Sequence, residues 1–253
     1  MNKIILITGA TSGFGKAIAE KFAAASYNCI ITGRRKERLV DLAKNLEAKN
    51  NIKVLPLCFD VRNREEVFNQ LTTLTTEWQK IDILVNNAGL AAGRESFDNG
   101  TLDDFDLMID TNVKGLLYVS KAIIPFMKNT GGGHIINIGS TAAKQVYKDG
   151  NIYCASKQAV DAISQAQRID LLPYKIKVTA IHPGAAETEF ALVRFKNDEE
   201  KAKAVYNGYK PLTANDIADT VYYCATLPPH VCINDLVITC TAQADNFYFY
   251  KEG

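Results

Sequence analysis

Short apolar runs recur along the chain, and longer segments with helical spacing separate them. The runs are rich in Val, Ile and Leu rather than alternating, which is typical of strands in a parallel sheet covered on both faces. We expect strands at residues 3–8, 28–33, 53–59, 82–86, 134–139, 175–182 and 235–240. The spacing between them predicts helices at residues 13–26, 36–49, 62–78, 102–128, 152–172 and 215–227.

This alternation of strands and helices predicts the fold class. We expect a single-domain, Rossmann-like α/β fold: a doubly wound parallel β-sheet of about seven strands with helices on both faces. No internal repeat, low-complexity tract or linker divides residues 1–253, so we expect one domain. Residues 186–211 are charged and aromatic and fall outside the strand rhythm, and we expect them to form a lid over a site.

Composition excludes several other classes of protein. The chain has 253 residues, of which 47% are hydrophobic and 23% charged, and a formal net charge of +1. A nucleic-acid partner is not expected, and no apolar run approaches the length of a membrane span. Six cysteines without paired spacing predict buried, reduced thiols, and three scattered histidines predict no metal site. We expect a cytoplasmic protein without a cleaved leader.

A glycine-rich turn follows the first predicted strand and leads directly into a helix. Glycine permits a tight turn and close approach to a pyrophosphate, while the helix directs its free N–H groups at the anion. Glycine also serves ordinary turns, so the support comes from the flanking strand and helix. The residues expected to bind a dinucleotide here are Gly9, Thr11, Ser12, Gly13, Phe14 and Gly15.

The second predicted strand ends in Gly-Arg-Arg, where NAD enzymes usually carry an acid. Arg34 and Arg35 would attract a 2′-phosphate, so the sequence favours NADP(H) over NAD(H). A solvated basic helix start is the alternative, although cations oppose the dipole there. At the same sheet edge, Asp60 would accept from the adenine amino group. Asn87 and Gly89 would line the ribose, with Val61 and Ala88 beside them.

Tyr153 and Lys157 carry the candidate chemistry. They are four residues apart, so they share one helix face, and the ammonium should lower the pKa of the phenol. Tyr153 would then act as an acid or base towards an alcohol or carbonyl. Ser140, at the end of the fifth predicted strand, would hydrogen-bond the reacting oxygen. The Tyr and Lys spacing also arises by chance in helices, so the conjunction with Ser140 and the glycine turn carries the interpretation.

The motifs TGATSGFG, NNAG and YCASK, with the serine after strand five, resemble the short-chain dehydrogenase/reductase family over essentially the whole chain. The resemblance implies a catalytic tetrad of Asn112, Ser140, Tyr153 and Lys157. It also implies that Lys157 holds the nicotinamide ribose and that Asn112 anchors a water in a proton relay. Pro183, Gly184 and Thr188 would contact the nicotinamide end. The long fourth and fifth helices resemble the pair through which the family forms homotetramers.

Residues 188–190, 193–198 and 227–234 resemble a subgroup of NADP-dependent 3-hydroxy acid dehydrogenases, which also accept serine and allo-threonine and reduce malonic semialdehyde. Such a substrate would contact Ser140 and Tyr153, and its carboxylate needs a cation. Arg194 and Lys196 are the candidates, with a solvated helix face as the alternative for each. Residues 143–146, 148–149 and 185–187 depart from the subgroup pattern, so the sequence leaves the identity of the substrate open. Reduction of 3-oxoacyl groups on a carrier protein and a non-catalytic NADP(H) sensor are the competing functions.

Overall fold

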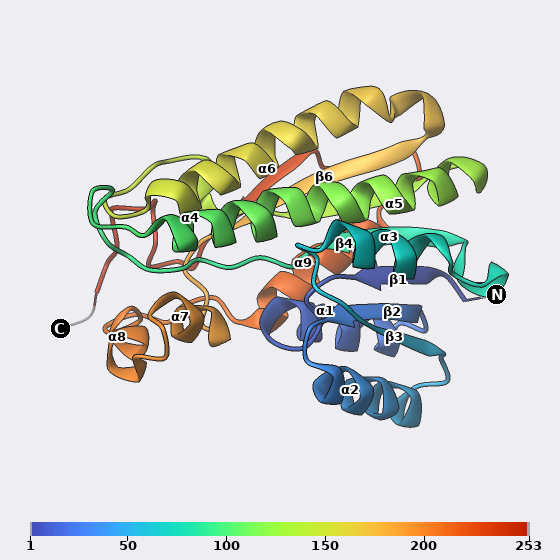
Figure 1. The fold of residues 1–253 in the computed structure, drawn as a ribbon, viewed down its shortest axis with the longest axis horizontal. Helices are drawn as coiled ribbons and strands as arrows, with labels where there is room; N and C mark the ends of the chain where they lie inside the picture. Colours follow the sequence, from blue (N-terminus) through green and yellow to red (C-terminus); the bar gives the residue numbers. More distant parts are fainter. Residues whose placement is uncertain (1, 252–253) are drawn as a thin grey trace.

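The structure is a computed structural model that describes residues 2–251, in which seven strands form one parallel sheet (Figure 1). The strand order is β3-β2-β1-β4-β5-β6-β7, so the chain reverses its direction of winding between β1 and β4. The predicted fold class is confirmed, and each predicted strand is present with ends shifted by at most two residues. The strands are β1 (Ile4–Ile7), β2 (Asn28–Gly33), β3 (Val54–Cys58), β4 (Ile81–Asn86), β5 (Gly133–Ile138), β6 (Ile176–Pro183) and β7 (Asp235–Ile238).

Helices cover both faces of the sheet. The helices are α1 (Gly13–Ala24), α2 (Lys36–Lys49), α3 (Arg64–Thr72), α4 (Leu102–Ile109), α5 (Leu116–Asn129), α6 (Asn151–Asp170), α7 (Glu189–Arg194), α8 (Glu199–Ala204) and α9 (Ala214–Thr226). Figure 1 shows α1, α2 and α9 on one face and α3, α5 and α6 on the other. Three 3-10 turns, η1 (Thr76–Trp78), η3 (Thr141–Ala143) and η4 (Leu172–Tyr174), complete the connections.

Two apolar layers hold this sandwich together. Successive side chains of a strand point to opposite faces, so Ile5 and Ile7 of β1 pack with Phe22 of α1, while Leu6 packs with Ile123 of α5. Leu6 and Ile7 are completely buried. The need to fill both layers explains why the strands are continuously apolar rather than alternating.

Two predicted helices differ from the structure. The helix predicted at residues 62–78 ends at Thr72, because the hydroxyls of Thr72 and Thr73 bond to backbone carbonyls four residues back and the chain then turns into η1. The segment predicted as one helix at residues 102–128 is interrupted by a π-helical turn, η2 (Asp110–Gly115), between α4 and α5. Turns of this kind often occur at functional sites, and η2 contains Asn112.

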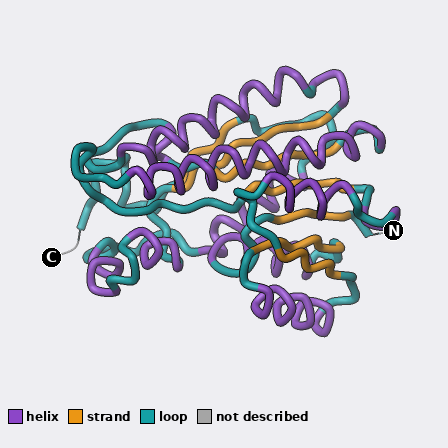
Figure 2. The backbone as a smooth tube through the Cα atoms, in the orientation of Figure 1, coloured by secondary structure: helices purple, strands orange, loops and turns teal. Residues whose placement is uncertain are grey.

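Residues 186–211 contain the two short helices α7 and α8, which the hydrophobic pattern does not reveal. Each begins at a residue whose side chain accepts a hydrogen bond from the first turn, Thr188 for α7 and Asp198 for α8. Figure 2 shows both helices set apart from the layers that cover the sheet. This segment, which we call the lid segment, therefore has its own local structure.

The predicted burial of the thiols is correct for four of the six cysteines. Within residues 2–251 all six are unpaired, but Cys58 is exposed and Cys232 is half-buried. Burial raises the pKa of the Cys29 thiol to about 12, so this side chain packs as a small apolar group. Across the same residues, no helix combines the length and apolar character that a membrane span requires.

Candidate active site

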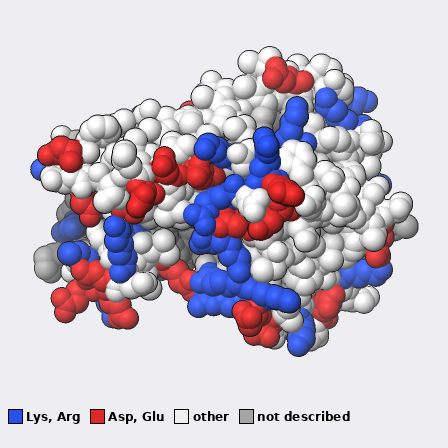
Figure 3. All heavy atoms as spheres, in the orientation of Figure 1, with Lys and Arg blue, Asp and Glu red and all other residues white. Residues whose placement is uncertain are grey.

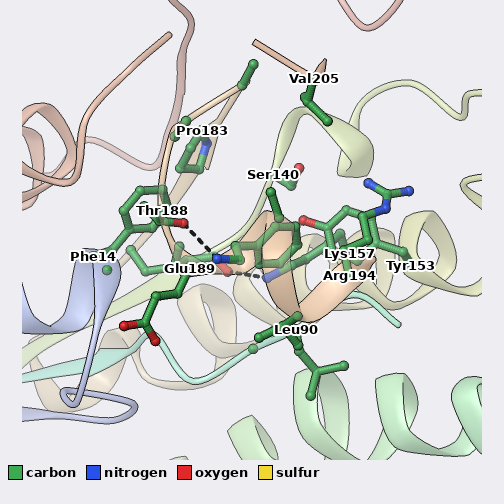
Figure 4. A pocket seen from close by; sticks show the side chains of 18 of the residues that line it. Phe14, Leu90, Ser140, Tyr153, Lys157, Pro183, Thr188, Glu189, Arg194 and Val205 are labelled. Atoms are coloured by element: carbon green, nitrogen blue, oxygen red, sulfur yellow. Dashed lines mark hydrogen bonds between the residues drawn. The ribbon is translucent and has the colours of Figure 1, made fainter. Parts of the chain in front are cut away.

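The carboxyl ends of the strands open into a cleft of about 960 Å³. It lies where the winding reverses, between β1 and β4, which is the usual ligand position in open α/β sheets. The glycine turn after β1 lines one end, and Ser140, α6 and the lid segment line the other. Figure 4 shows this cleft from close by.

The glycine turn is shaped for close approach of an anion. Gly9 and Gly13 have φ values of 67° and 50°, and a β carbon on Gly15 would overlap the carbonyl oxygen of Gly9. The Asn87 amide donates to the carbonyls of Thr8 and Gly9, at 2.8 and 3.2 Å, and so holds the turn against the end of β4. In the described structure no side chain caps the start of α1, which leaves its first N–H groups for a ligand.

Basic side chains surround the far end of the glycine turn. The Arg35 guanidinium donates to Thr11 Oγ1 and Ser12 Oγ, both at 2.8 Å, so it lies directly over the turn. Arg34 also lines the cleft, and its Nη1 lies 3.8 Å from Asp60 Oδ2. Figure 3 shows Lys and Arg gathered across the middle of this face, beside α2 and α3, with acidic groups between them. This end of the cleft is therefore suited to an anion.

Asp60 lines the cleft and is paired with neighbouring arginines. Its carboxylate accepts from the Arg62 guanidinium at 2.6 Å. Burial alone would raise the pKa of Asp60, but the hydrogen bonds and charge of Arg62, with Arg34, hold it below its ordinary value. Asp60 is thus ionised and paired, and its contact with adenine stays a prediction.

Ser140, Tyr153 and Lys157 meet at the other end of the cleft (Figure 4). Ser140 follows β5 by two residues and precedes η3, and its hydroxyl accepts from the Ala142 N–H at 3.1 Å, which fixes the side chain beyond the strand end. Tyr153 and Lys157 lie one turn apart on α6 and are both buried. The Lys157 ammonium donates to the Ile138 carbonyl at 3.0 Å and lies 6.0 Å from the centre of the Tyr153 ring.

The proton affinities of this group correct one sequence prediction. Burial raises the pKa of Tyr153 above its ordinary value, and the Tyr147 phenol adds to the rise, while Ser140 and Arg194 act in the opposite direction. Burial lowers the pKa of Lys157 to about 8. The prediction that Lys157 gives Tyr153 a lowered pKa is therefore wrong for the structure, because desolvation outweighs the favourable charges.

Asn112 lies behind the cleft wall rather than on it. Its amide exchanges two hydrogen bonds with the Leu90 backbone, each at 2.8 Å, and donates to Ser156 Oγ at 2.9 Å. A β carbon on Gly89 would lie 3.2 Å from Asn112 Oδ1 and 3.4 Å from Lys157 Nζ. Asn112 therefore joins the segment after β4 to α6 beside Lys157, and its predicted water contact stays a prediction.

Arg194 is a cation of the lid segment that lies beside Tyr153. Its guanidinium carbon lies 5.5 Å from the centre of the Tyr153 ring, and Nη1 donates to the Tyr147 hydroxyl at 3.0 Å. Arg194 Nε is buried and has no hydrogen-bond partner among the described residues. Lys196, the alternative candidate, does not line the cleft and pairs with Asp104 at 2.9 Å.

Several lining residues were missed in the sequence. Tyr147 lines the cleft and stands between the two short stretches, 143–146 and 148–149, that depart from the subgroup pattern. Its being the one aromatic residue between Ser140 and Tyr153 was the available signal. Phe190 packs against Tyr153 with ring centres 5.7 Å apart. Part of the stretch 243–251 also lines the cleft, and no local motif marks it. Of the predicted site residues and candidates, Gly15, Asn112 and Lys196 stand outside the lining.

Asp161, His182 and Asp235 form a cluster beneath Ser140 that sequence spacing did not reveal. Their ligand atoms lie within 4.8 Å of one another. The Lys144 ammonium bridges the two carboxylates, so one cation already offsets part of their charge. His182 Nδ1 faces the Ser140 carbonyl at 3.2 Å. The absence of a metal from the function stays a prediction.

A dinucleotide turn and a Ser, Tyr and Lys group in one cleft define a dinucleotide-binding oxidoreductase. The chain belongs to the short chain dehydrogenase family, whose pattern matches residues 3–199.

Three known proteins show the extent of this similarity. The NADP-dependent 3-hydroxy acid dehydrogenase YdfG of Escherichia coli K12 is 45% identical over 242 residues, which cover 95% of this chain and 96% of that protein. Sulfoacetaldehyde reductase 2 of Chromohalobacter salexigens is 42% identical over 96% of each chain. The closed form of serine dehydrogenase complexed with NADP+ is 43% identical, covers 99% of this chain and all of its own, and superposes with a TM-score of 0.91.

Proposed function

We propose that the protein is an NADP(H)-dependent oxidoreductase for small substrates in which a single carbon separates an acidic group from the reacting carbon. Malonic semialdehyde would be reduced to 3-hydroxypropionate, and serine and allo-threonine would be oxidised in the opposite direction. The observation that carries this proposal is the meeting of Ser140, Tyr153 and Lys157 in the cleft that also contains the glycine turn.

The cofactor assignment rests on the fit of the glycine turn and the basic residues. The uncapped start of α1 would receive the pyrophosphate, and Arg34 and Arg35 would hold the 2′-phosphate of NADP(H). Lys157 would hold the nicotinamide ribose, and the lining residues Pro183, Gly184 and Thr188 would contact the nicotinamide end. When bound, the nicotinamide supplies or accepts the hydride.

Tyr153 would transfer the proton that accompanies the hydride. Because burial raises its pKa, the phenol keeps its proton at neutral pH and is ready to donate it to the oxygen of a carbonyl under reduction. Ser140 would hold the same oxygen and stabilise its growing negative charge. Asn112 would keep the Leu90 segment and α6 in register beside Lys157.

Arg194 would bind the acidic group of the substrate. Its unpartnered Nε and its position beside Tyr153 suit an anion that is attached close to the reacting carbon. The names of the relatives agree with this chemistry, since 3-hydroxy acids, serine and sulfoacetaldehyde all carry an acid one carbon from the carbon that reacts. The lid segment would thus determine the substrate class.

We also propose a homotetramer in the cytoplasm. The long helices α5 and α6 lie next to each other on an outer face (Figure 1), and Ile169 near the end of α6 and Leu172 of η4 are exposed. Free, buried thiols suit a reducing compartment. Light scattering coupled to gel filtration tests the assembly, and a monomer at micromolar concentration would exclude it.

The direct test is a turnover assay followed at the nicotinamide absorbance band. Malonic semialdehyde and sulfoacetaldehyde are offered with NADPH or NADH, and L-serine and allo-threonine with NADP+ or NAD+. We expect turnover with the phosphorylated cofactors and faster reduction of the acidic aldehydes than of propanal. Turnover of 3-oxoacyl thioesters alone would assign a carrier-linked reductase, and NADPH binding without any turnover would assign a sensor.

A further inference from the structure

Glu189, the first residue of α7, reaches from the lid segment to the basic end of the cleft. Its carboxylate accepts from Arg35 Nη1 and from Arg38 Nη1, each at 3.0 Å. The three side chains are between 42% and 53% exposed, so solvent has access to the contact. A carboxylate of the lid thus lies between two guanidinium groups that follow β2 in the chain.

The position of this carboxylate matters because Arg35 has a second set of contacts. The same guanidinium donates to Thr11 and Ser12 in the glycine turn, so Arg35 points into the dinucleotide end of the cleft while it holds Glu189. Burial alone would raise the pKa of Glu189, but Arg35 and Arg38 hold it below its ordinary value. Glu189 is therefore an anion bound where a phosphate is expected.

The other end of α7 reaches the catalytic group. Arg194, the last residue of the helix, donates to the Tyr147 hydroxyl, and its backbone carbonyl accepts from the Gly93 N–H at 3.0 Å. Figure 4 shows Arg194 beside Tyr153 and the Glu189 carboxylate directed away from them. One helix of six residues thus spans the cofactor end and the substrate end of the cleft.

We propose that Glu189 is an internal anion that competes with the 2′-phosphate of NADP(H) for Arg35. This inference rests on the NADP(H) dependence proposed above. A phosphate carries more charge and more acceptor oxygens than a carboxylate, so it displaces Glu189 and frees the start of α7. NAD(H) has no such group and leaves the contact in place. Glu189 therefore lowers the affinity for the phosphorylated cofactor and makes the position of α7 sensitive to it.

Replacement of Glu189 by Gln tests the competition through binding rather than turnover. Glu189→Gln keeps the shape and removes the charge, and Glu187→Gln is the matched control, since Glu187 is exposed and has no ion pair among the described residues. The ligands are adenosine 2′,5′-bisphosphate and adenosine 5′-phosphate, which differ only in the 2′-phosphate. Titration calorimetry gives Kd for each pair.

We expect Glu189→Gln to lower the Kd of the bisphosphate about two- to tenfold, because two half-exposed ion pairs contribute a free energy of that size. The Kd of the monophosphate should change by less than about twofold. Glu187→Gln should change neither. Equal effects on both ligands, no effect, or weaker binding of the bisphosphate would overturn the competition. If the wild-type protein does not prefer the bisphosphate, the NADP(H) assignment itself fails. If that preference is present and Glu189→Gln leaves it unchanged, the competition alone fails.

Hydrogen exchange of α7 measures the release of the helix. In the wild-type protein, the bisphosphate should accelerate exchange of the backbone amides in residues 189–195, while the monophosphate should not. In Glu189→Gln, exchange should already be fast without ligand. Slower exchange of this segment in the wild-type complex would contradict the release of α7.

Discussion

Replacement of Arg194 by Met separates substrate recognition from catalysis. Arg194 Nε is buried without a partner and its guanidinium stands beside Tyr153, so an acidic substrate would gain charge-assisted hydrogen bonds there. Hydrogen bonds to charged groups contribute about 1.5–3 kcal/mol, which corresponds to a loss of roughly 10- to 150-fold in kcat/KM. The backbone contact of Arg194 with Gly93 remains, so the lid segment should keep its position.

The assay compares malonic semialdehyde with propanal, which has the same carbon chain and no acid. Arg194→Met should lower kcat/KM for malonic semialdehyde by roughly 10- to 150-fold and should change kcat/KM for propanal by less than about threefold. Lys196→Met is the control, because Lys196 is 60% exposed and pairs with Asp104 outside the cleft. An equal loss with both aldehydes, or the same loss in Lys196→Met, would refute the role of Arg194.

Two further predictions concern the cofactor and the stability of the fold. The double variant Arg34→Ala with Arg35→Ala should raise KM for NADPH at least about tenfold and leave KM for NADH within about threefold, and an unchanged ratio would remove the 2′-phosphate assignment. Burial lowers the pKa of His134 to about 3, so protonation of the unfolded chain below pH 6.5 costs stability. Its contribution should fall by about 2 kcal/mol from pH 7 to pH 5. Urea unfolding of His134→Gln should show a correspondingly shallower loss, and an identical pH profile would contradict this account.

The fold could be predicted because its signal is local. The central strands β1, β4 and β5 bury both faces and are therefore continuous apolar runs that can be recognised in the sequence. The predicted bounds of β2 and α2 are those of the structure. The exceptions have local causes that compete with periodicity. Thr72 and Thr73 bond back to the α3 carbonyls, and the π-helical turn at Asn112 shifts the helical period without changing the composition.

The site was predictable where a motif carries the chemistry and not where distant segments meet. The glycine turn, Ser140, Tyr153 and Lys157 are marked by sequence and converge on one cleft. Glu189 and Arg35 are 154 residues apart, and no pattern in either segment shows that they pair. The predicted direction of the Tyr153 pKa shift was wrong for a similar reason. Burial of the phenol raises its pKa, and this burial depends on packing around the ring rather than on the spacing to Lys157.

The two ends of the cleft have different electrostatic characters. Solvent reaches the basic groups at the dinucleotide end, whereas Tyr153 and Lys157 are buried. Exposed charges favour capture and exchange of a large anionic cofactor, since each contact is weak and reversible. Buried groups keep defined positions and sharply shifted pKa values, which suits proton transfer. The lid segment connects these environments through α7.

The Tyr153→Phe variant tests whether Tyr153 transfers the proton in a hydride-transfer reaction. The substitution removes one oxygen from a buried ring and leaves the glycine turn and the arginines unchanged. Turnover of malonic semialdehyde with NADPH should fall by about 10²- to 10⁴-fold, while Kd for NADPH stays within about twofold. Turnover close to the wild-type rate, or loss of NADPH binding together with activity, would contradict this role.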